Sequence, residues 1–342
     1  MGWVGALTAL SWVYRLIWNL REIWHSVIAQ PSRISRVRTI ALGNLVIGGA
    51  GKTPCALALA QALTQEGIAC GLISRGYGSK AEGRRSQVIC PQELVNRNAG
   101  EIGDEAWLLC WRSQLPIAVG KNRFQSLAAL LAARPEIRVA ILDDGLQQRS
   151  LHCDETILII DERGFGNEQC LPLGPLREPI GNLKRFSAWI ANGNVTSTTP
   201  LPEMPIRHGV LHLRPSQWVC LESWQDSRTW LDLKTGLVRF AEQKILAVAG
   251  IAVPDRFFDS LRSLGLSFDA LALPDHDPEI VGMTLSRWET GRYTTILMTE
   301  KDAVKFFHAN IDLRHQFWAL RQEPVLDNLF VKEIISSLPP SV

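Results

Sequence analysis

The stretch GNLVIGGAGKT, residues 43–53, lies between a predicted buried strand, 37–43, and a predicted helix, 52–66. The strand is expected from its short, mainly apolar run, and the helix from the spacing of its many Ala and Leu residues. A glycine-rich turn between a strand and a helix lets backbone N–H groups converge on phosphate oxygens. This stretch therefore predicts a phosphate-binding loop (P-loop) in an α/β fold.

The loop ends in Lys52 and Thr53, whose side chains suit the charge of a nucleotide. Lys52 is expected to reach the β and γ phosphates, and the Thr53 hydroxyl to bind Mg²⁺. Val46 stands where the pattern G-x-x-x-x-G-K-[ST] has its first glycine. The residues expected to contact the nucleotide are Val46, Ile47, Gly48, Gly49, Ala50, Gly51, Lys52 and Thr53.

Two acidic segments are candidate partners of this loop. The apolar run 139–142 ends in Asp143 and Asp144, and a carboxylate at the end of a neighbouring strand orients the metal in P-loop enzymes. Both are candidate metal residues, and the alternative is a surface turn. Asp104 opens a predicted helix, 104–112, where acidic residues also serve as caps.

Strands and helices alternate along the rest of the chain. Further strands are predicted at 69–74, 115–119, 157–160, 244–249 and 294–298, and further helices at 124–133 and 254–264. This alternation predicts a doubly wound parallel sheet. The segment 192–205, rich in Asn, Thr and Pro, predicts a loop or hinge. We therefore expect a P-loop NTPase-like α/β domain at 31–200, a second, smaller α/β lobe at 201–342 that closes over the active site, and an amphipathic helix at 1–30.

The composition excludes several classes of protein. With 342 residues, 46% of them hydrophobic, and a net charge of +2, the chain is long enough for two globular domains and is not disordered or fibrous. Its seven cysteines form no C-x-x-C pair, which excludes a zinc ribbon or a small disulfide scaffold and indicates a reducing compartment. Nucleic acid is not expected as a partner.

The first 28 residues predict a helix at a membrane surface. A polar stripe at helical spacing consists of Thr8, Ser11, Arg15, Asn19, Glu22 and Ser26, and the rest of the helix is apolar. Four of the chain's twelve tryptophans lie here, namely Trp3, Trp12, Trp18 and Trp24, and the first 40 residues carry five Arg and one Glu. Interfacial Trp and Arg favour membrane binding. The alternatives are a helix packed on the core and a signal or membrane span, which the short uncharged run 1–14 disfavours. The other eight tryptophans are assigned to core packing.

Several segments together resemble the tetraacyldisaccharide 4'-kinase family, the lipid A kinases (LpxK) of Gram-negative envelope biosynthesis. They are GNLVIGGAGKTP (43–54), SRGYG (74–78), GDE (103–105), DDGLQ (143–147), LPLGPLREP (171–179), AGIAVPDRFF (249–258), PDH (274–276) and TEKDAVK (299–305). The resemblance accounts for the absence of a glycine at Val46, because the family has Ser or Thr at this position instead of Gly. The charges of TEKDAVK are also typical of a solvated helix, and we assign them no role.

The resemblance implies transfer of the γ-phosphoryl group of ATP, with Mg²⁺, to the 4'-hydroxyl of a tetraacylated glucosamine disaccharide 1-phosphate. It implies a peripheral, monotopic protein on the cytoplasmic face of the inner membrane. By similarity, Asp104 is the base for the sugar hydroxyl, His276 orients it, and Lys52 acts on the phosphates. Residues implied to lie near the substrate or the transferred phosphate are Arg123, Gln148, Arg177 and Glu178.

The chain departs from the family pattern at four positions. Gln148 replaces a His, Cys153 an Arg, Ala106 a Pro and Asp277 a second His. Gln148 can donate a hydrogen bond to phosphate but cannot carry a positive charge. Two other functions are therefore weighed beside the kinase: a membrane-associated P-loop ATPase or GTPase switch, and a kinase homologue that has lost catalysis.

Overall fold

The computed structural model describes residues 2–27, 31–81, 85–146, 150–193, 207–224, 226–307 and 314–337. The strands are β1 (Arg38–Gly43), β2 (Cys70–Ser74), β3 (Gln87–Ile89), β4 (Ile117–Val119), β5 (Val139–Leu142), β6 (Glu155–Asp161), β7 (Ala188–Asn192), β8 (Arg207–Cys220), β9 (Leu231–Asp232), β10 (Ile245–Ala249), β11 (Asp269–Ala272), β12 (Thr295–Thr299) and β13 (Phe317–Leu326). The α-helices are α1 (Gly2–Val27), α2 (Lys52–Gln65), α3 (Ala99–Ile102), α4 (Asp104–Ser113), α5 (Arg123–Ala133), α6 (Leu233–Phe240), α7 (Pro254–Ser263), α8 (Ile280–Trp288), α9 (Glu300–Ala303) and α10 (Asn328–Ser336). Short 3₁₀ helices are η1 (Pro91–Asn96), η2 (Ile180–Arg185), η3 (Ser227–Thr229), η4 (Val304–Phe306) and η5 (Arg314–Gln316).

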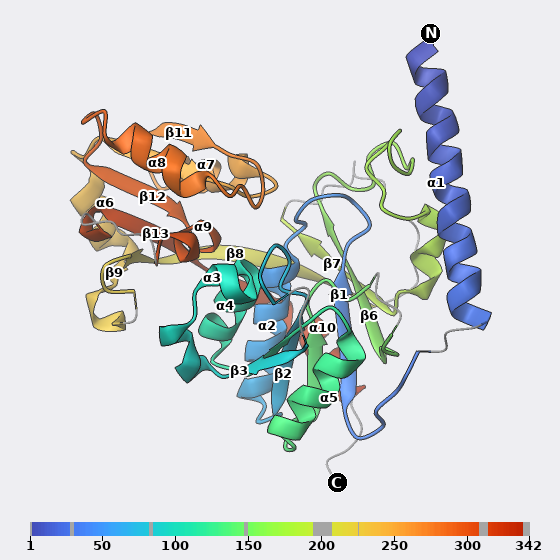
Figure 1. Cartoon of the computed structure of the whole chain (residues 1–342). Helices are drawn as coiled ribbons and strands as arrows, with labels where there is room; N and C mark the ends of the chain where they lie inside the picture. Colours follow the sequence, from blue (N-terminus) through green and yellow to red (C-terminus); the bar gives the residue numbers. More distant parts are fainter. Residues whose placement is uncertain are drawn as a thin grey trace.

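One sheet of 13 strands runs through the described residues in the order β11-β10-β12-β13-β8-β7-β6-β1-β5-β2-β4-β3, with β9 paired to β8 (Figure 1). The strand β1 lies between β5 and β6 and is parallel to both. The mostly parallel α/β sheet expected from the alternation is confirmed. Its antiparallel pairs are β3–β4, β8–β9 and β8–β13. Because β1 and β5 are parallel neighbours, the P-loop and the acidic pair after β5 lie at the same edge of the sheet.

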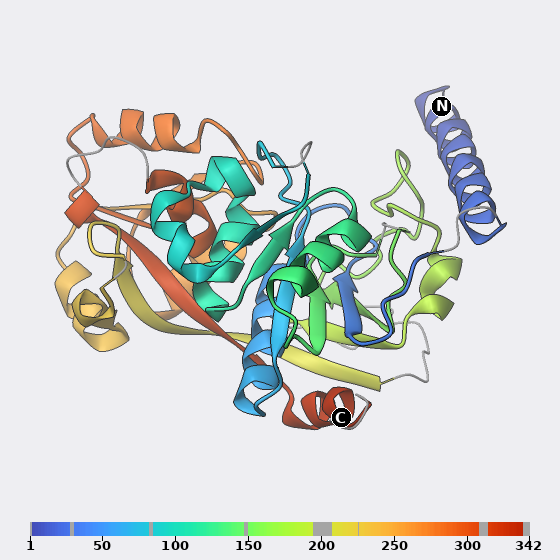
Figure 2. The same cartoon turned by 60° about the horizontal axis from the view of Figure 1, so that its bottom comes forward.

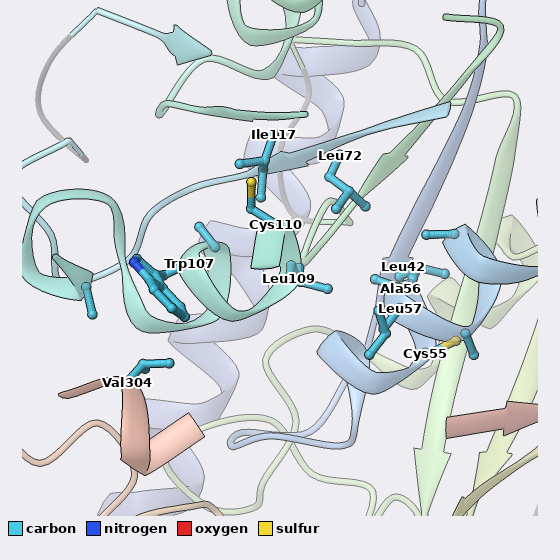
Figure 3. Packing of buried hydrophobic residues seen from close by; sticks show 14 of the residues in the cluster. Leu42, Cys55, Ala56, Leu57, Leu72, Trp107, Leu109, Cys110, Ile117 and Val304 are labelled. Carbon is cyan, nitrogen blue, oxygen red and sulfur yellow. The ribbon is translucent and has the colours of Figure 1, made fainter. Parts of the chain in front are cut away.

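Helices cover both faces of the first lobe. Alternate residues of β1 point to opposite faces: Ile40 and Leu42 join the core under α2 and α4, and Ala41 joins the core under α5. Figure 3 shows part of the first core, where Trp107 of α4 points toward Val304 of the second lobe. This hydrophobic core is therefore continuous between the two lobes.

The long strands β8 and β13 join the lobes, running side by side from one to the other (Figure 2). The start of β8 pairs with β7 of the first lobe, and its remainder pairs with β13. After β13, α10 packs back against α2 and β8. Of the loop predicted at 192–205, residues 194–205 lie outside the described residues. The division of the chain at residue 200 stays a prediction.

The helix α1 stands at the edge of the first lobe opposite the second lobe (Figures 1 and 2). It contacts the protein through its polar side: the Ser11 hydroxyl donates to the Cys170 carbonyl (2.8 Å), and the Tyr14 hydroxyl donates to the Arg177 carbonyl (2.6 Å). The apolar side is exposed at Leu7, Leu10, Trp12, Val13, Leu16, Ile17, Leu20, Ile23 and Trp24. This exposure contradicts the alternative in which the apolar face packs on the core.

The four tryptophans of the first helix do not all lie on its exposed side, contrary to the expectation. Trp18 is buried against the protein, so its assignment to the exposed anchor was wrong; it lies on the same side of α1 as Ser11. Trp12 and Trp24 are exposed, and the Trp3 side chain lies outside the described part of the chain. The other eight are buried or packed on a core, as predicted. They include a cluster of contacting rings between α4 and the second lobe, in which Trp111 stacks on Trp107 and meets Trp224 and Trp230 at a tilt.

Among the described residues, no helix has the length and apolar character needed to cross a bilayer. This includes α1, which has 26 residues.

Candidate active site

The P-loop leads from β1 into α2 through Gly51, a position with no room for a larger residue. Gly51 precedes α2 with φ of 92°, and a Cβ there would lie 2.1 Å from Nδ2 of Asn192. Asn192, at the end of β7, donates to the Ala50 carbonyl (2.8 Å). No side chain caps α2, so the amides of its first turn are available to an anion.

Asn44 holds the loop from inside. Its Nδ2 donates to the carbonyls of Val46 (2.7 Å) and Gly48 (3.0 Å), and its Oδ1 accepts from Lys52 Nζ (3.0 Å). Val46 is buried, and its backbone bridges to Leu176 of the LPLGPLREP segment. A side chain at position 46 is thus accommodated because it packs into the core. Sequence reasoning missed Asn44, which is part of the loop motif but carries no charge.

Asp143 and Asp144 lie beside the start of α2. Thr53 Oγ1 donates to Asp143 Oδ2 (3.4 Å), and Lys52 Nζ lies 3.4 Å from Asp144 Oδ1. Arg177 Nη1 lies 3.6 Å from Asp144 Oδ2. The structure therefore brings together the predicted phosphate and metal residues of three separate segments.

Among the described residues, the buried Oδ1 of Asp143 has no hydrogen-bond partner. Burial and the charge of Glu105 raise the pKa of Asp143 to about 7, although Lys52 opposes this. A hard divalent cation such as Mg²⁺ suits an unpaired carboxylate oxygen next to a threonine hydroxyl. No set of three His, Cys, Asp or Glu among the described residues could hold a metal alone, so such a cation would share its coordination with phosphates and water.

The remaining predicted phosphate residues have different surroundings. Arg123, the first residue of α5, is buried and donates to the Gly120 carbonyl (2.6 Å). Burial lowers the pKa of Arg123 to about 10, while Asp144 and Asp143 raise it, so the guanidinium stays charged at neutral pH. Glu178 is fully buried and accepts from Arg185 (2.6 Å) and Asn182 (3.2 Å).

The contacts of Glu178 with Arg185 and Asn182 hold η2 against the segment that carries Arg177. Direct contact of Glu178 with a phosphate stays a prediction. Gln148 lies outside the described residues.

A second polar group forms where α4 of the first lobe meets the second lobe. His276 Nδ1 lies 3.2 Å from Asp104 Oδ2, and Asp104 Oδ1 accepts from the amide of Glu105 (2.8 Å). Burial raises the pKa of Asp104, but the hydrogen bond from His276 and the charges of Lys301 and Lys305 outweigh it and hold that pKa at about 2. Asp104 is thus an anion at neutral pH.

Lys301 completes this group. Its Nζ lies 2.9 Å from Glu105 Oε1, 2.9 Å from Asp275 Oδ1 and 3.1 Å from His276 Nε2. Sequence reasoning missed Lys301: the segment TEKDAVK marked a resemblance, but the partners of Lys301 are distant in sequence.

Both groups meet a cavity of about 730 Å³ between the lobes. Its lining includes Lys52 and Thr53 on one side and Glu105, Asp275 and Lys301 on the other. The second lobe approaches the P-loop closely, since a Cβ on Gly49 would lie 3.5 Å from Cβ of Ala252 and 3.9 Å from Asp275 Oδ2. A molecule bound to the P-loop therefore also meets the second lobe.

Two arginines make contacts around the cavity, one within the first lobe and one between the lobes. Arg163, after β6, donates to the carbonyls of Ile47 (3.2 Å) and Gly49 (3.1 Å) in the P-loop. Arg256 of α7 donates to Glu162 Oε1 across the lobes (2.7 Å). Neither arginine was identified from the sequence.

Comparisons with known proteins agree over nearly the whole chain. A family model described as "Tetraacyldisaccharide-1-P 4'-kinase" matches residues 3–338. The tetraacyldisaccharide 4'-kinase of Herminiimonas arsenicoxydans is 36% identical over 336 residues, which are 97% of this chain and 91% of that protein. The one of Dechloromonas aromatica is 37% identical over 305 residues, 87% and 83% of the respective chains.

A solved structure shows the same fold. It is the "apo" form of LpxK from Aquifex aeolicus, described as a complex with ATP, and it superposes with a TM-score of 0.76. The match covers 98% of this chain and 99% of that one at 22% identity.

Proposed function

This chain belongs to the tetraacyldisaccharide-1-P 4'-kinase family, and we propose that it transfers the γ-phosphoryl group of ATP to the 4'-hydroxyl of a tetraacylated glucosamine disaccharide 1-phosphate in lipid A biosynthesis. One observation in the site carries the proposal. The nucleotide-binding residues Lys52 and Thr53 line the same cavity as Glu105 and Lys301, the immediate neighbours of the Asp104–His276 pair.

The P-loop binds the phosphates of ATP. The first-turn amides of α2 and the Lys52 ammonium supply positive charge, and Lys52 exchanges its contact with Asp144 for phosphate oxygens. Bound Mg²⁺ supplies charge neutralisation of the β and γ phosphates, and Thr53 and Asp143 are the residues that would hold it. Arg123 and Arg177, both near Asp144, stabilise the charge on the transferred group.

Asp104 receives the proton of the attacking hydroxyl. Its pKa of about 2 makes it a weak base, but a loose phosphoryl-transfer transition state needs placement of the hydroxyl more than early proton removal. His276 donates to Asp104 Oδ2 and fixes the orientation of the carboxylate. Because Asp104 is in the first lobe and His276 in the second, the pair is complete only when the lobes are closed.

We propose further that α1 binds the cytoplasmic face of the inner membrane as a peripheral, monotopic anchor. Its polar side contacts the protein, and its exposed side carries Leu16, Ile17, Leu20 and Trp24. Burial of such a face in the headgroup region is favourable, and arginines near the helix favour anionic lipids. This placement brings the cavity to an acceptor whose acyl chains stay in the bilayer.

Incubation of the purified chain with Mg²⁺, the acceptor and ATP labelled at its γ-phosphate tests the kinase function. We expect labelled lipid, and none from an acceptor that already carries a 4'-phosphate. Labelled inorganic phosphate without labelled lipid would indicate the ATPase switch, and neither product the degenerate homologue. Either result, under conditions where a relative phosphorylates the lipid, would overturn the proposal.

A further inference from the structure

Lys301 connects ionisable groups of both lobes at one buried point. It is the second residue of α9, and its side chain is only 16% exposed. The ammonium group contacts Glu105 of the first lobe and Asp275 of the second, both at 2.9 Å. Burial lowers the pKa of Lys301, but the charges of Glu105, Asp104 and Asp275 outweigh it and raise that pKa, so the ammonium form persists.

The third contact of Lys301 decides where His276 carries its proton. An ammonium group has hydrogens to donate and no lone pair, so Nε2 of His276, at 3.1 Å, is the acceptor. An imidazole that accepts at Nε2 carries its single proton at Nδ1. That nitrogen faces Asp104 Oδ2 at 3.2 Å. Hydrogen bonds thus run in one direction, from Lys301 through His276 to Asp104.

The backbone of His276 supports a fixed ring orientation. Its φ of 60° is in the left-handed region, which a non-glycine residue adopts only when its surroundings hold it there. The ring of Tyr77 also meets the imidazole edge-on, with centroids 5.5 Å apart. The ring of His276 is therefore held in the orientation in which Nε2 faces Lys301 and Nδ1 faces Asp104.

We infer that Lys301 is a positioning residue whose ammonium group occupies Nε2 of His276 and so fixes the tautomer of the neutral imidazole, with its proton at Nδ1 facing Asp104. This inference deepens the proposed function and, for its catalytic meaning, rests on it. With Nε2 occupied, His276 has no free site for the proton of the acceptor hydroxyl. Asp104 is left as the base, and His276 acts by orienting it.

The charged groups around His276 together set the pH at which its ring takes up a second proton. Among the described residues, its acidic neighbours are Asp104 and Glu105 of α4 and the adjacent Asp275, Lys301 is basic and Tyr77 is ionisable. Lys305 lies 3.8 Å from Asp104 Oδ2, the oxygen that His276 contacts. The hydrogen bond to Asp104 raises the pKa of His276 above its usual value, although burial and the charge of Lys301 oppose this. Removal of the Lys301 charge must therefore raise that pKa further.

NMR titration of the His276 ring in the full chain tests this without substrate. The signal is assigned by its loss in His276→Asn. Lys301→Met is expected to raise the titration midpoint by about one pH unit or more, and Lys301→Arg, which keeps the charge, to restore most of the wild-type value. An unchanged midpoint in folded Lys301→Met would overturn the inference and leave Lys301 as an ion pair between the lobes.

A second variant gives a result of opposite sign. Glu105→Gln removes an acidic neighbour that raises the pKa of His276, so it must lower the midpoint. If Lys301→Met does not fold, Lys301→Gln decides the question in its place, because it also removes the ammonium charge, and an unchanged midpoint there would contradict the inference. A shifted midpoint in a protein that makes no labelled lipid would refute the kinase proposal and leave the Lys301–His276 assignment intact.

Discussion

Two buried aspartates of the site have opposite electrostatic surroundings. Burial dominates at Asp143, whose pKa rises to about 7, whereas His276, Lys301 and Lys305 outweigh burial at Asp104, whose pKa is about 2. A buried carboxylate such as Asp143 is costly to ionise alone, and a bound divalent cation would stabilise its ionised form. A carboxylate such as Asp104, which is ionised at neutral pH, can accept a proton or a hydrogen bond. The two environments therefore separate a metal-binding role from a base role.

Replacement of Asp104 tests the base role. Asp104→Asn is expected to lower kcat by about 10²- to 10⁴-fold, because the amide cannot accept the hydroxyl proton, while ATP still binds at the P-loop. Turnover and nucleotide affinity are to be measured on the same preparation. Asp277→Asn is the matched control, since the Asp277 side chain accepts from the amide of Glu279 (2.8 Å), a bond that the Asn side chain can also accept, and it should turn over like the wild type. Wild-type turnover in Asp104→Asn would remove Asp104 from the mechanism.

Asp143 and Asp144 should differ in their effect on the metal requirement. Asp143→Asn is expected to raise the Mg²⁺ concentration for half-maximal activity by roughly tenfold or more, because the unpaired Oδ1 is lost as a ligand. Asp144→Asn should raise it less, since Asp144 Oδ2 faces Arg177 and the Thr53 hydroxyl contacts Asp143. A Mg²⁺ titration of activity compares the two, and an unchanged requirement in Asp143→Asn would exclude it as a ligand.

At the scale of the element, α1 and the segment 170–186 link the proposed membrane anchor to the site. Tyr14 of α1 bonds the carbonyl of Arg177, whose side chain faces Asp144 next to Lys52. The amide of Arg177 in turn donates to the Leu45 carbonyl at the start of the P-loop (2.8 Å). A single hydrogen bond thus separates α1 from a residue of the phosphate site.

Loss of apolar groups on the exposed side of α1 should release the protein from membranes. The triple variant Trp12→Ser, Leu16→Ser, Leu20→Ser removes three side chains that are 65%, 58% and 57% exposed. Sedimentation with vesicles that contain anionic lipid should show binding on the order of 100-fold weaker, with ATP binding unchanged. Val238→Ser, at a 74% exposed position of the second lobe, is the control and should bind vesicles normally. Undiminished sedimentation of the triple variant would exclude this face as the anchor.

At the scale of the whole molecule, one sheet and one core join the two lobes. The core that contains Leu57 of α2 also contains Val248 of β10, and β8 pairs with strands of both lobes. If the lobes close over the cavity as we propose, we therefore expect the motion to bend β8 and β13.

The ion pair between Arg256 and Glu162 is expected to favour the closed arrangement. Arg256→Glu should lower kcat/KM several-fold through repulsion from Glu162 and Asp161, which lie on the other lobe. The double variant Arg256→Glu, Glu162→Arg should recover part of the loss, and the loss should shrink in high salt. Steady-state kinetics of the two variants test this role of the ion pair. If kcat/KM of the double variant did not recover, Arg256 would not act through its ion pair with Glu162.

Local patterns predicted the elements that carry the site. The run before Asp143 matched β5 at 139–142, and the helix predicted at 104–112 corresponds to α4 (Asp104–Ser113). Each of these signals lies within a few consecutive residues, so periodicity and capping suffice to find it.

Contacts between distant segments were beyond such patterns. Lys301 and Glu105 are 196 positions apart, and no local signal pairs them. The antiparallel β8–β13 ladder that joins the lobes was likewise not predicted, because pairing depends on the whole fold. Burial of Trp18 depends on the surface that meets α1, which helical periodicity alone does not identify.

The central claim is that two lobes bring ATP and one hydroxyl of a lipid to the same cavity. The position of the added phosphate tests it most directly, by mass spectrometry and phosphorus NMR of the lipid after reaction with Mg²⁺ and ATP. The account predicts a single new phosphate on the 4'-oxygen with the wild-type chain, and no phosphorylated lipid with Asp104→Asn although it binds ATP. A phosphate at another oxygen, or ATP hydrolysis with the lipid unchanged, would contradict it.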